Sequence, residues 1–375
     1  MAKKKDGLSA GASGGEKKSA AKSGAASKKK SGDALREKLK AELRAEIEAE
    51  LRKEIEAEIR AEYRKKQREQ KPQVSAEENY NLGDSFFYGR GFAKNYKKAV
   101  EYYRKAARGN YIEAQVSLGE CYLNGLGVEK DESKAIEWYT KAAEQGHAAA
   151  QYILALSYEK GEVVEKDDGL ALEWYIKAAE NGHMGAQYGL ALCYDRGDIV
   201  EKDYEKAVNW YRKAAEQGHM DAQYNLGVCY SSGRGVIKDD VMAAAWYKSA
   251  AEQGHAEAQC NLGWCYEIGE GVAEDYDMAA IWYKSAAEQG NAEAQCNLGA
   301  YFEFGVGSTE DFGMAVEWYR KAAEQGLAEA QYHLGKCYYS GKGVAKDKAQ
   351  AAEWFIKAAE QGDEDAQKAL KKLGY

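Results

Sequence analysis

Four histidines recur at one position of the sequence, and histidine is the residue type here best suited to bind a metal or to move a proton. They follow one another at intervals of 36 residues: His147, His183, His219 and His255. If each 36-residue unit is a pair of helices, as argued below, equivalent atoms of successive units lie about 9–10 Å apart. Rings at that distance cannot share one ion through bonds of about 2 Å. We therefore expect capping or turn residues here, and we predict no metal site.

The cysteines are the other reactive side chains, and their spacing argues against both disulfides and zinc. They are Cys121, Cys193, Cys229, Cys260, Cys265, Cys296 and Cys337. No C-x-x-C pair occurs, and Cys260 and Cys296 would lie one unit apart, beyond the reach of a disulfide. We expect reduced, buried thiols. No grouping of Ser, Cys or His indicates nucleophilic catalysis, and the G-x-G turns lack the preceding strand of a phosphate loop, so we predict neither catalytic residues nor a cofactor.

A 36-residue repeat positions all of these side chains. Its most regular mark is a glutamine that recurs without a change of register: Gln115, Gln151, Gln187, Gln223, Gln259, Gln295, Gln331 and Gln367. Asn79 stands one period upstream of this series. A fixed period in this range is typical of stacked supersecondary units, each of which cannot bury its apolar face alone.

The unit at residues 220–255 begins with the pattern of an amphipathic helix. Ala222, Leu226 and Tyr230 are four residues apart, so they lie on one side of a first helix. Gly227 stands at the edge of that side, where we expect it to let another backbone approach closely.

The second half of the same unit predicts a second helix. The Gly-Arg-Gly turn at residues 233–235 ends the first helix, and Asp239 is well placed to cap the second. The second helix carries a stripe at helical spacing: Ala243, Trp246, Tyr247 and Ala250. The unit is therefore a helical hairpin whose apolar stripes need neighbouring hairpins. We interpret the recurring tryptophan as part of the core.

The residues of this unit match a known family. The consensus pattern of the units is A-x-A-Q-Y-x-L-G-x-x-Y, then G-x-G-V, then Asp, then A-x-x-W-Y-x-K-A-A-E-Q-G-H. This pattern resembles the Sel1-like repeat, a relative of the tetratricopeptide repeat. The resemblance covers about residues 76–375, with eight repeats in 76–363 and a C-terminal capping helix in 364–375. It implies an all-α protein, a right-handed α-solenoid of helical hairpins that scaffolds or adapts other proteins. It does not by itself imply a catalyst.

The N-terminal part of the chain differs in composition from the repeats. Residues 1–32 are mainly Lys, Ser, Ala and Gly, so we expect a disordered basic tail. Lysine triplets at 3–5 and 28–30 could be a nuclear address, but such clusters are common in solvated tails. No apolar run approaches the roughly 20 residues of a membrane span, and no secretory signal is present. We expect a cytoplasmic protein, with nuclear localisation through the tail as the alternative.

Residues 33–71 predict one long charged helix without Gly or Pro. Its large apolar residues are spaced four apart: Leu35, Leu39, Leu43, Ile47, Leu51, Ile55, Ile59 and Tyr63. A step of four residues rotates this stripe by about 40° each time, so it is not a heptad seam. The helix could be a solvated rigid spacer or a self-associating, coiled-coil-like segment. We favour association slightly, because so many large apolar groups are unusual in water.

Charge is distributed unevenly and indicates the kind of partner. The net charge is +7 in residues 1–32 and +1 in residues 33–71, which leaves −16 for the rest of a chain whose total is −8. An acidic solenoid repels nucleic-acid backbones and anionic membranes. A protein partner with basic character is the better expectation.

The side of the first helix turned away from its core stripe is where we expect that partner to bind. In related tetratricopeptide solenoids this helix lines the concave surface, and an asparagine ladder there resembles one that holds an extended peptide. The predicted binding residues are Ile153, Leu156, Leu192, Asn225, Val228, Asn261, Trp264, Ile268, Asn297 and Phe304. We expect Trp264 to be the main anchor. Alternatively, the asparagines only fill consensus positions and Trp264 folds back on its own repeat.

Two functions therefore stay open. The first is a noncatalytic scaffold or adaptor that binds a peptide or helix of another protein along the concave first-helix surface. The second is an enzyme or enzyme-like hydrolase, because some solenoids of the resembling family have been credited with hydrolytic activity. The absence of a nucleophile arrangement favours the scaffold.

Overall fold

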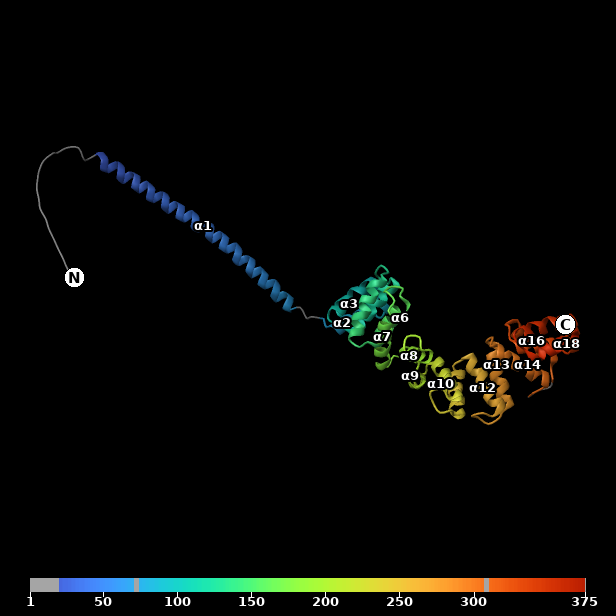
Figure 1. Cartoon of the computed structure of the whole chain (residues 1–375). Coiled ribbons are helices and arrows are strands. Elements are labelled where there is room, and N and C mark those ends of the chain that lie inside the picture. The colour runs from blue at the N-terminus through green and yellow to red at the C-terminus, as the bar shows by residue number, and fades with distance from the viewer. Residues whose placement is uncertain (1–19, 71–73, 307–309, 375) are drawn as a thin grey trace, which may run out of the picture. The chain divides into compact units, whose positions relative to one another are not determined.

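The computed structural model describes residues 20–70, 74–306 and 310–374 of the chain (Figure 1). Within those ranges the secondary structure is eighteen α-helices without a strand. Helix α1 (Ala20–Gln70) belongs to one compact unit, and helices α2–α18 form another. The all-α solenoid of helical hairpins expected from the sequence is confirmed.

Helix α1 begins earlier than we expected. It starts at Ala20, so residues 20–32, which we assigned to a disordered tail, are helical. A shortage of apolar residues excludes a packed core, but it does not oppose a solvated helix, for which alanine and lysine have high propensity. The first lysine triplet of the expected tail, at 3–5, lies outside the described residues.

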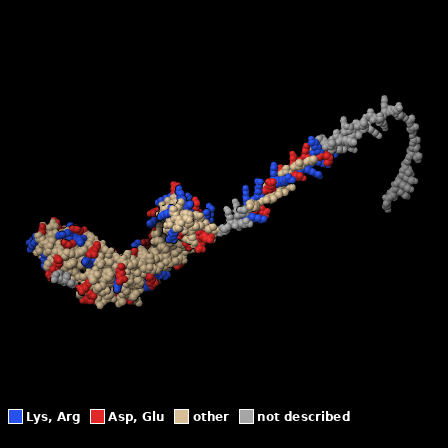
Figure 2. Space-filling model, turned by 180° about the vertical axis from the view of Figure 1, so that it is seen from behind, with Lys and Arg blue, Asp and Glu red and all other residues tan. Residues whose placement is uncertain are grey.

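The apolar stripe of α1 is exposed to solvent. The exposed fractions are 46–65% for Leu39, Leu43, Ile47, Leu51, Ile55, Ile59 and Tyr63. Charges of both signs alternate between them (Figure 2), including the ion pairs Glu56–Arg60 at 3.6 Å and Glu62–Lys66 at 3.9 Å. Each such exposed pair supports a helix by only a few tenths of a kcal/mol. Both the spacer and the self-association hypotheses for this helix stay predictions.

The second unit is a series of hairpins, each made of a first and a second helix. The first helices are α2 (Ala76–Tyr88), α4 (Ile112–Asn124), α6 (Ala148–Lys160), α8 (Met184–Arg196), α10 (Met220–Ser232), α12 (Ala256–Ile268), α14 (Ala292–Phe304) and α16 (Ala328–Ser340). The second helices are α3 (Tyr96–Arg108), α5 (Glu132–Glu144), α7 (Asp168–Glu180), α9 (Tyr204–Glu216), α11 (Asp240–Glu252), α13 (Tyr276–Glu288), α15 (Phe312–Glu324) and α17 (Lys348–Glu360). A last helix, α18 (Glu364–Leu373), covers the end of the series. Helices that are consecutive in sequence pack on one another.

The turn inside each hairpin has the chemistry that the sequence indicated. Helix α10 ends at Gly233, whose backbone is left-handed with φ 69°. Asp239 then accepts the backbone N–H of Met242 at 3.0 Å and caps α11. The Asp239 N–H itself donates to the carbonyl of Tyr230 at 3.0 Å, which fixes the start of α11 to the end of α10.

The four recurring histidines cap the first helices, as we expected. The Nδ1 atom of each accepts the backbone N–H three residues later, at 3.1–3.4 Å: His147, His183, His219 and His255. Three of the rings also stack on a tyrosine in the first helix of the preceding hairpin, for example His219 on Tyr188 of α8 with ring centroids 4.3 Å apart. Their recurrence reflects a structural role at the junction between repeats.

Acid should destabilise the solenoid through these caps. Burial lowers the pKa of His183 and of His219 below 6.5, and a protonated Nδ1 could not accept the capping hydrogen bond. As the pH falls below about 6.5, the unfolded chain binds protons before the folded chain does, so the free energy of unfolding should decrease until the folded-state pKa values are passed. We expect His219→Asn to reduce this dependence, because Asn291 is already an asparagine cap. Urea unfolding at several pH values measures it, and an unchanged dependence in the variant would contradict the assignment.

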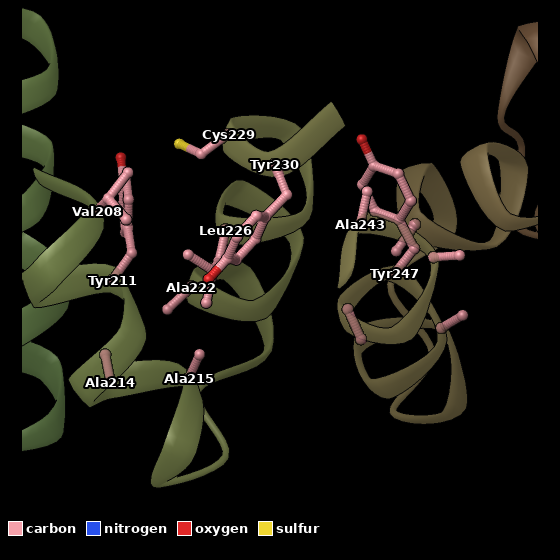
Figure 3. Close-up of a cluster of buried hydrophobic side chains, with 14 of the residues drawn as sticks. Val208, Tyr211, Ala214, Ala215, Ala222, Leu226, Cys229, Tyr230, Ala243 and Tyr247 are labelled. Carbon is pink, nitrogen blue, oxygen red and sulfur yellow. The ribbon is translucent and has the colours of Figure 1, made fainter. Parts of the chain in front are cut away.

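Six of the eight repeats bury a large aromatic ring against a glycine of the first helix, and the other two have Ala155 and Ala191 at that position. Figure 3 shows Tyr211 and Tyr247 in one cluster with Leu226 and Cys229, which spans α9, α10 and α11. A Cβ atom on Gly227 would lie 2.6 Å from Cδ1 of Tyr247. The backbone oxygen of Ala243 would lie 3.3 Å from the same Cβ, so a backbone does approach Gly227 as we expected, but the nearest neighbour is the tyrosine ring of the second helix.

The hydroxyl groups of six of the seven buried tyrosines, all but Tyr139, have partners on the first helix of the same hairpin. Tyr283 donates to Glu267 at 2.6 Å and Tyr319 to Glu303 at 2.7 Å. The last full repeat has Phe355 at the tyrosine position, and the position that faces it holds Tyr339 in place of an acid. The repeat thus avoids leaving a buried hydroxyl unpaired.

The glutamine that marks the period joins three helices. Gln223 Nε2 donates to the carbonyl of Ala215, at the end of α9, at 3.1 Å. Its Oε1 accepts from Gln253, at the end of α11, at 2.7 Å. The same pair of bonds recurs around Gln187, Gln259, Gln295 and Gln331. A buried amide therefore ties every inner hairpin to the one before it.

The seven cysteines are free and buried, in agreement with our expectation for the thiols. In the part of the chain that the structure describes, no helix is both long enough and apolar enough to cross a lipid bilayer.

Candidate partner-binding surface

Four cavities open at the same place in different repeats, between one first helix and the next. Their volumes are about 210 Å³ at α4–α6, about 400 Å³ at α6–α8, about 220 Å³ at α10–α12 and about 210 Å³ at α16–α18. The aromatic residue of the intervening second helix contributes to every one: Tyr139, Tyr175, Tyr247 and Phe355. The periodic core thus creates a periodic series of cavities, which we call the first-helix cavities.

The walls of the first-helix cavities are equivalent in position and different in chemistry. One wall position holds Leu123, Glu159, Ser231 and Tyr339 in the four cavities. A position on the opposite wall holds Leu156, Leu192, Trp264 and Lys372. The backbone geometry therefore repeats from cavity to cavity while the chemistry of the walls changes.

The structure brings half of the predicted binding residues into these cavities. They are Ile153, Leu156, Leu192, Asn261 and Trp264. Trp264 is 48% exposed, so it does not fold back into the core of its own repeat.

The other five predicted residues do not line the four cavities. Ile268 and Phe304 are exposed, at 47% and 64%. Asn225, Val228 and Asn297 are half-buried along the first helices.

The asparagines of the proposed ladder already have neighbours in the fold. Burial raises the pKa of Tyr247, and a hydrogen bond from the side chain of Asn261 opposes this rise. Asn225 acts in the same way on Tyr188. These amides therefore lie next to tyrosines of the solenoid.

Sequence reasoning missed the second-helix contribution to the cavities. The aromatic ring at the base of each cavity was assigned to the core. An acid at the start of three second helices was not considered: Glu132, Asp168 and Asp240. The 36-residue period, applied to the second helix as it was to the first, would have identified both positions.

These acids are paired with lysines of the preceding turn. Glu132 pairs with Lys130 at 2.7 Å, and Asp240 with Lys238 at 3.1 Å. The cavities are therefore not strongly acidic themselves, and the preference for a basic partner rests on the net charge of the repeats. The last cavity is different, since its lining includes three lysines: Lys336, Lys368 and Lys372.

The reactive groups in the cavities are held in unreactive forms. Burial raises the pKa of the Cys193 and Cys265 thiols to about 11, although both residues contribute to cavity walls. A thiol that stays protonated at neutral pH is a poor nucleophile and a poor metal ligand. Across the described ranges, no three His, Cys, Asp or Glu residues gather closely enough to hold a metal ion.

These features define a class: an α-solenoid of paired helices with a periodic surface, a design typical of protein-interaction scaffolds and typically noncatalytic. The model of the Sel1 repeat matches the chain at residues 79–111, 112–147, 148–183, 185–219, 221–255, 256–291, 292–327 and 328–363. The chain therefore belongs to the Sel1 repeat family.

Solved structures agree with this assignment. The structure of c5321, a protective antigen present in uropathogenic Escherichia coli strains, is 38% identical with a TM-score of 0.72, and the match covers 82% of this chain and 66% of that one. A Sel1 repeat protein from Oxalobacter formigenes is 35% identical with a TM-score of 0.56, and the match covers 83% of this chain and 90% of that one. No curated protein matches the sequence.

Proposed function

We propose that the solenoid is a noncatalytic scaffold or adaptor that binds an extended segment of another protein along its first helices. The observation that carries this proposal is the series of first-helix cavities, which recur in register with different side chains. A partner that ran along the repeats would place successive side chains in successive cavities. Binding of this kind requires no catalytic group.

The spacing of the cavities restricts the partner. Successive repeats stack about 10 Å apart. A partner segment in the polyproline II conformation advances about 3.1 Å per residue and returns its side chains to the same side every three residues, so neighbouring cavities would accept side chains three residues apart. The adjacent cavities at α4–α6 and α6–α8 offer Leu156 and Leu192 as apolar wall positions among charged residues. We therefore propose a segment with apolar anchors at this spacing and with basic residues between them, which suit the net charge of −16 in the repeats.

Trp264 is the anchor whose removal should weaken binding most. Its indole is about half exposed at the edge of the α10–α12 cavity, where a bound side chain could cover it. We expect Trp264→Ala to weaken a selected peptide by about thirtyfold, which corresponds to a hot-spot loss of about 2 kcal/mol. Peptides selected from a random displayed library on the full-length protein, then titrated against wild type and variant, measure the effect.

A matched control comes from the second helices. Ile356 is 37% exposed on α17 and does not line a first-helix cavity. Ile356→Ala should leave the same peptides bound with wild-type affinity. If selection yields no peptide, or if both variants bind equally well, the first helices are not the binding surface.

The enzyme-like alternative has no supporting observation among the described residues. Self-association through residues 33–71 also stays a prediction. It does not follow from the exposed stripe of α1 alone, because the stripe turns around the helix and offers any one partner only a short contact.

A further inference from the structure

One face of the second helices loses its charged residues in two consecutive repeats, 220–255 and 256–291. One position on this face holds Ala245 and Ile281 in these two repeats. In the other six repeats it holds Glu101, Glu137, Glu173, Asn209, Glu317 and Glu353. A second position is lysine in the other six repeats: Lys105, Lys141, Lys177, Lys213, Lys321 and Lys357. In these two repeats it is Ser249 and Ser285.

The missing lysines change the surroundings of the conserved aromatic ring of the repeat. In each of the other six repeats the lysine ammonium lies 3.7–4.6 Å from the centroid of that ring. A serine is too short to reach the ring, so Trp246 and Trp282 lack this cover. Both tryptophans are half-buried and pack against the same core cluster.

Exposed aliphatic side chains extend the uncharged area. Ile237 is 88% exposed, Val241 65% and Ile281 55%. We call Ile237, Val241, Ala245, Trp246, Ile281 and Trp282 the second-helix apolar face. Beside it, a cavity of about 350 Å³ between α13 and α14 is lined mainly by apolar residues, with Ile281, Tyr301 and Phe302 among them.

This face is separate from the first-helix cavities. On α11, Ala243 and Tyr247 line a cavity. At about 100° per residue, both lie about 160° from Ala245 around the helix. A ligand in the cavities therefore leaves the second-helix apolar face free.

We propose that the second-helix apolar face binds a second copy of this chain. Two solenoids that each carry a net charge of −16 repel each other, and this repulsion opposes a contact least where the charges are missing. A twofold contact places the same surface on both sides, and an apolar surface is complementary to itself whereas a surface of one charge is not.

The rim of the face also suits a twofold contact. The ion pairs Lys248–Glu252 and Lys284–Glu288, each at 3.9 Å, border it with both signs of charge. Ile237 and Val241 are the most exposed apolar groups of the face, and the α13–α14 cavity offers space for such groups from the other copy. Exposed apolar groups in this arrangement are typical of an interaction site.

Sedimentation of the full-length chain over a range of concentrations tests the proposal. We expect wild type to dimerise, and we expect the quadruple variant Ala245→Glu, Ser249→Lys, Ile281→Glu, Ser285→Lys to weaken dimerisation at least tenfold. Those residues are the ones that other repeats carry, so the fold should tolerate them. A second variant, Ile237→Glu with Val241→Glu, changes only exposed positions and should act in the same direction.

Two controls separate this face from other contacts. Glu137→Ala with Lys141→Ser removes the same charges from a distant repeat and should leave dimerisation unchanged. Ile47→Lys with Leu51→Glu interrupts the stripe of α1 and should also leave it unchanged. A monomeric wild type, or a dimer that only the α1 variant disrupts, would overturn the proposal. Peptide binding in the first-helix cavities is measured separately and does not depend on this result.

Discussion

Replacing Gly227 with valine should lower the free energy of unfolding by about 3 kcal/mol or more, because the new side chain has no space. Its Cβ would lie 2.6 Å from the ring of Tyr247, and the carbonyl oxygen of Ala243 is 3.3 Å away on another side. Tyr247 is only 4% exposed and cannot swing out without opening the hairpin. Urea unfolding followed by circular dichroism measures the loss, and hydrogen exchange in α10 and α11 locates it.

A control substitution is available at another helical glycine. Gly169 in α7 is exposed, and a Cβ there would meet only the side chain of Asp167 at 3.3 Å. Gly169→Val should leave stability nearly unchanged, since valine favours a helix slightly more than glycine does. Equal losses in the two variants would mean that the ring contact is not the cause.

Replacing Tyr283 with alanine should cost about 3–5 kcal/mol, the range measured for large aromatic residues removed from protein cores. The side chain is fully buried, it lies against Gly263, and its hydroxyl donates to Glu267 at 2.6 Å. Tyr283→Phe should cost much less, about 1 kcal/mol, because only the hydrogen bond is lost. Urea unfolding of the two variants separates the contribution of the ring from that of the hydroxyl.

Tyr276→Ala serves as the comparison, since this tyrosine is 45% exposed at the start of α13. It should change stability by less than about 1 kcal/mol. If Tyr283→Phe were as damaging as Tyr283→Ala, the bond to Glu267 would matter more than packing. The natural Phe355 at the equivalent position argues against that outcome.

The regular parts of this protein could be predicted from its sequence because each assignment can be checked at the equivalent position of several repeats. One histidine after a glycine is ambiguous, but four at a constant interval exclude a shared metal and indicate a cap. The turn glycine at Gly233 and the capping Asp239 follow from local rules that act within a few residues. Each of these assignments needed only the period and helical geometry.

What the sequence did not predict depends on contacts between helices. The ring that fills the space over Gly227 comes from another helix, and spacing within one helix does not identify it. The first-helix cavities combine residues from three helices, so sequence reasoning found only the wall that lies on the predicted face. The start of α1 was wrong for a different reason, since low hydrophobicity was taken as evidence against a solvated helix as well as against a core.

The neighbour-to-neighbour packing of α2–α18 has a further consequence for how the chain folds and bears load. Almost every contact joins segments close in sequence, so the contact order is low and folding can begin at any adjacent pair of hairpins. When the two ends are pulled apart, tension passes through the inter-hairpin junctions in series, and the weakest junction opens first while the rest stay folded. The protein should therefore lengthen in steps under force.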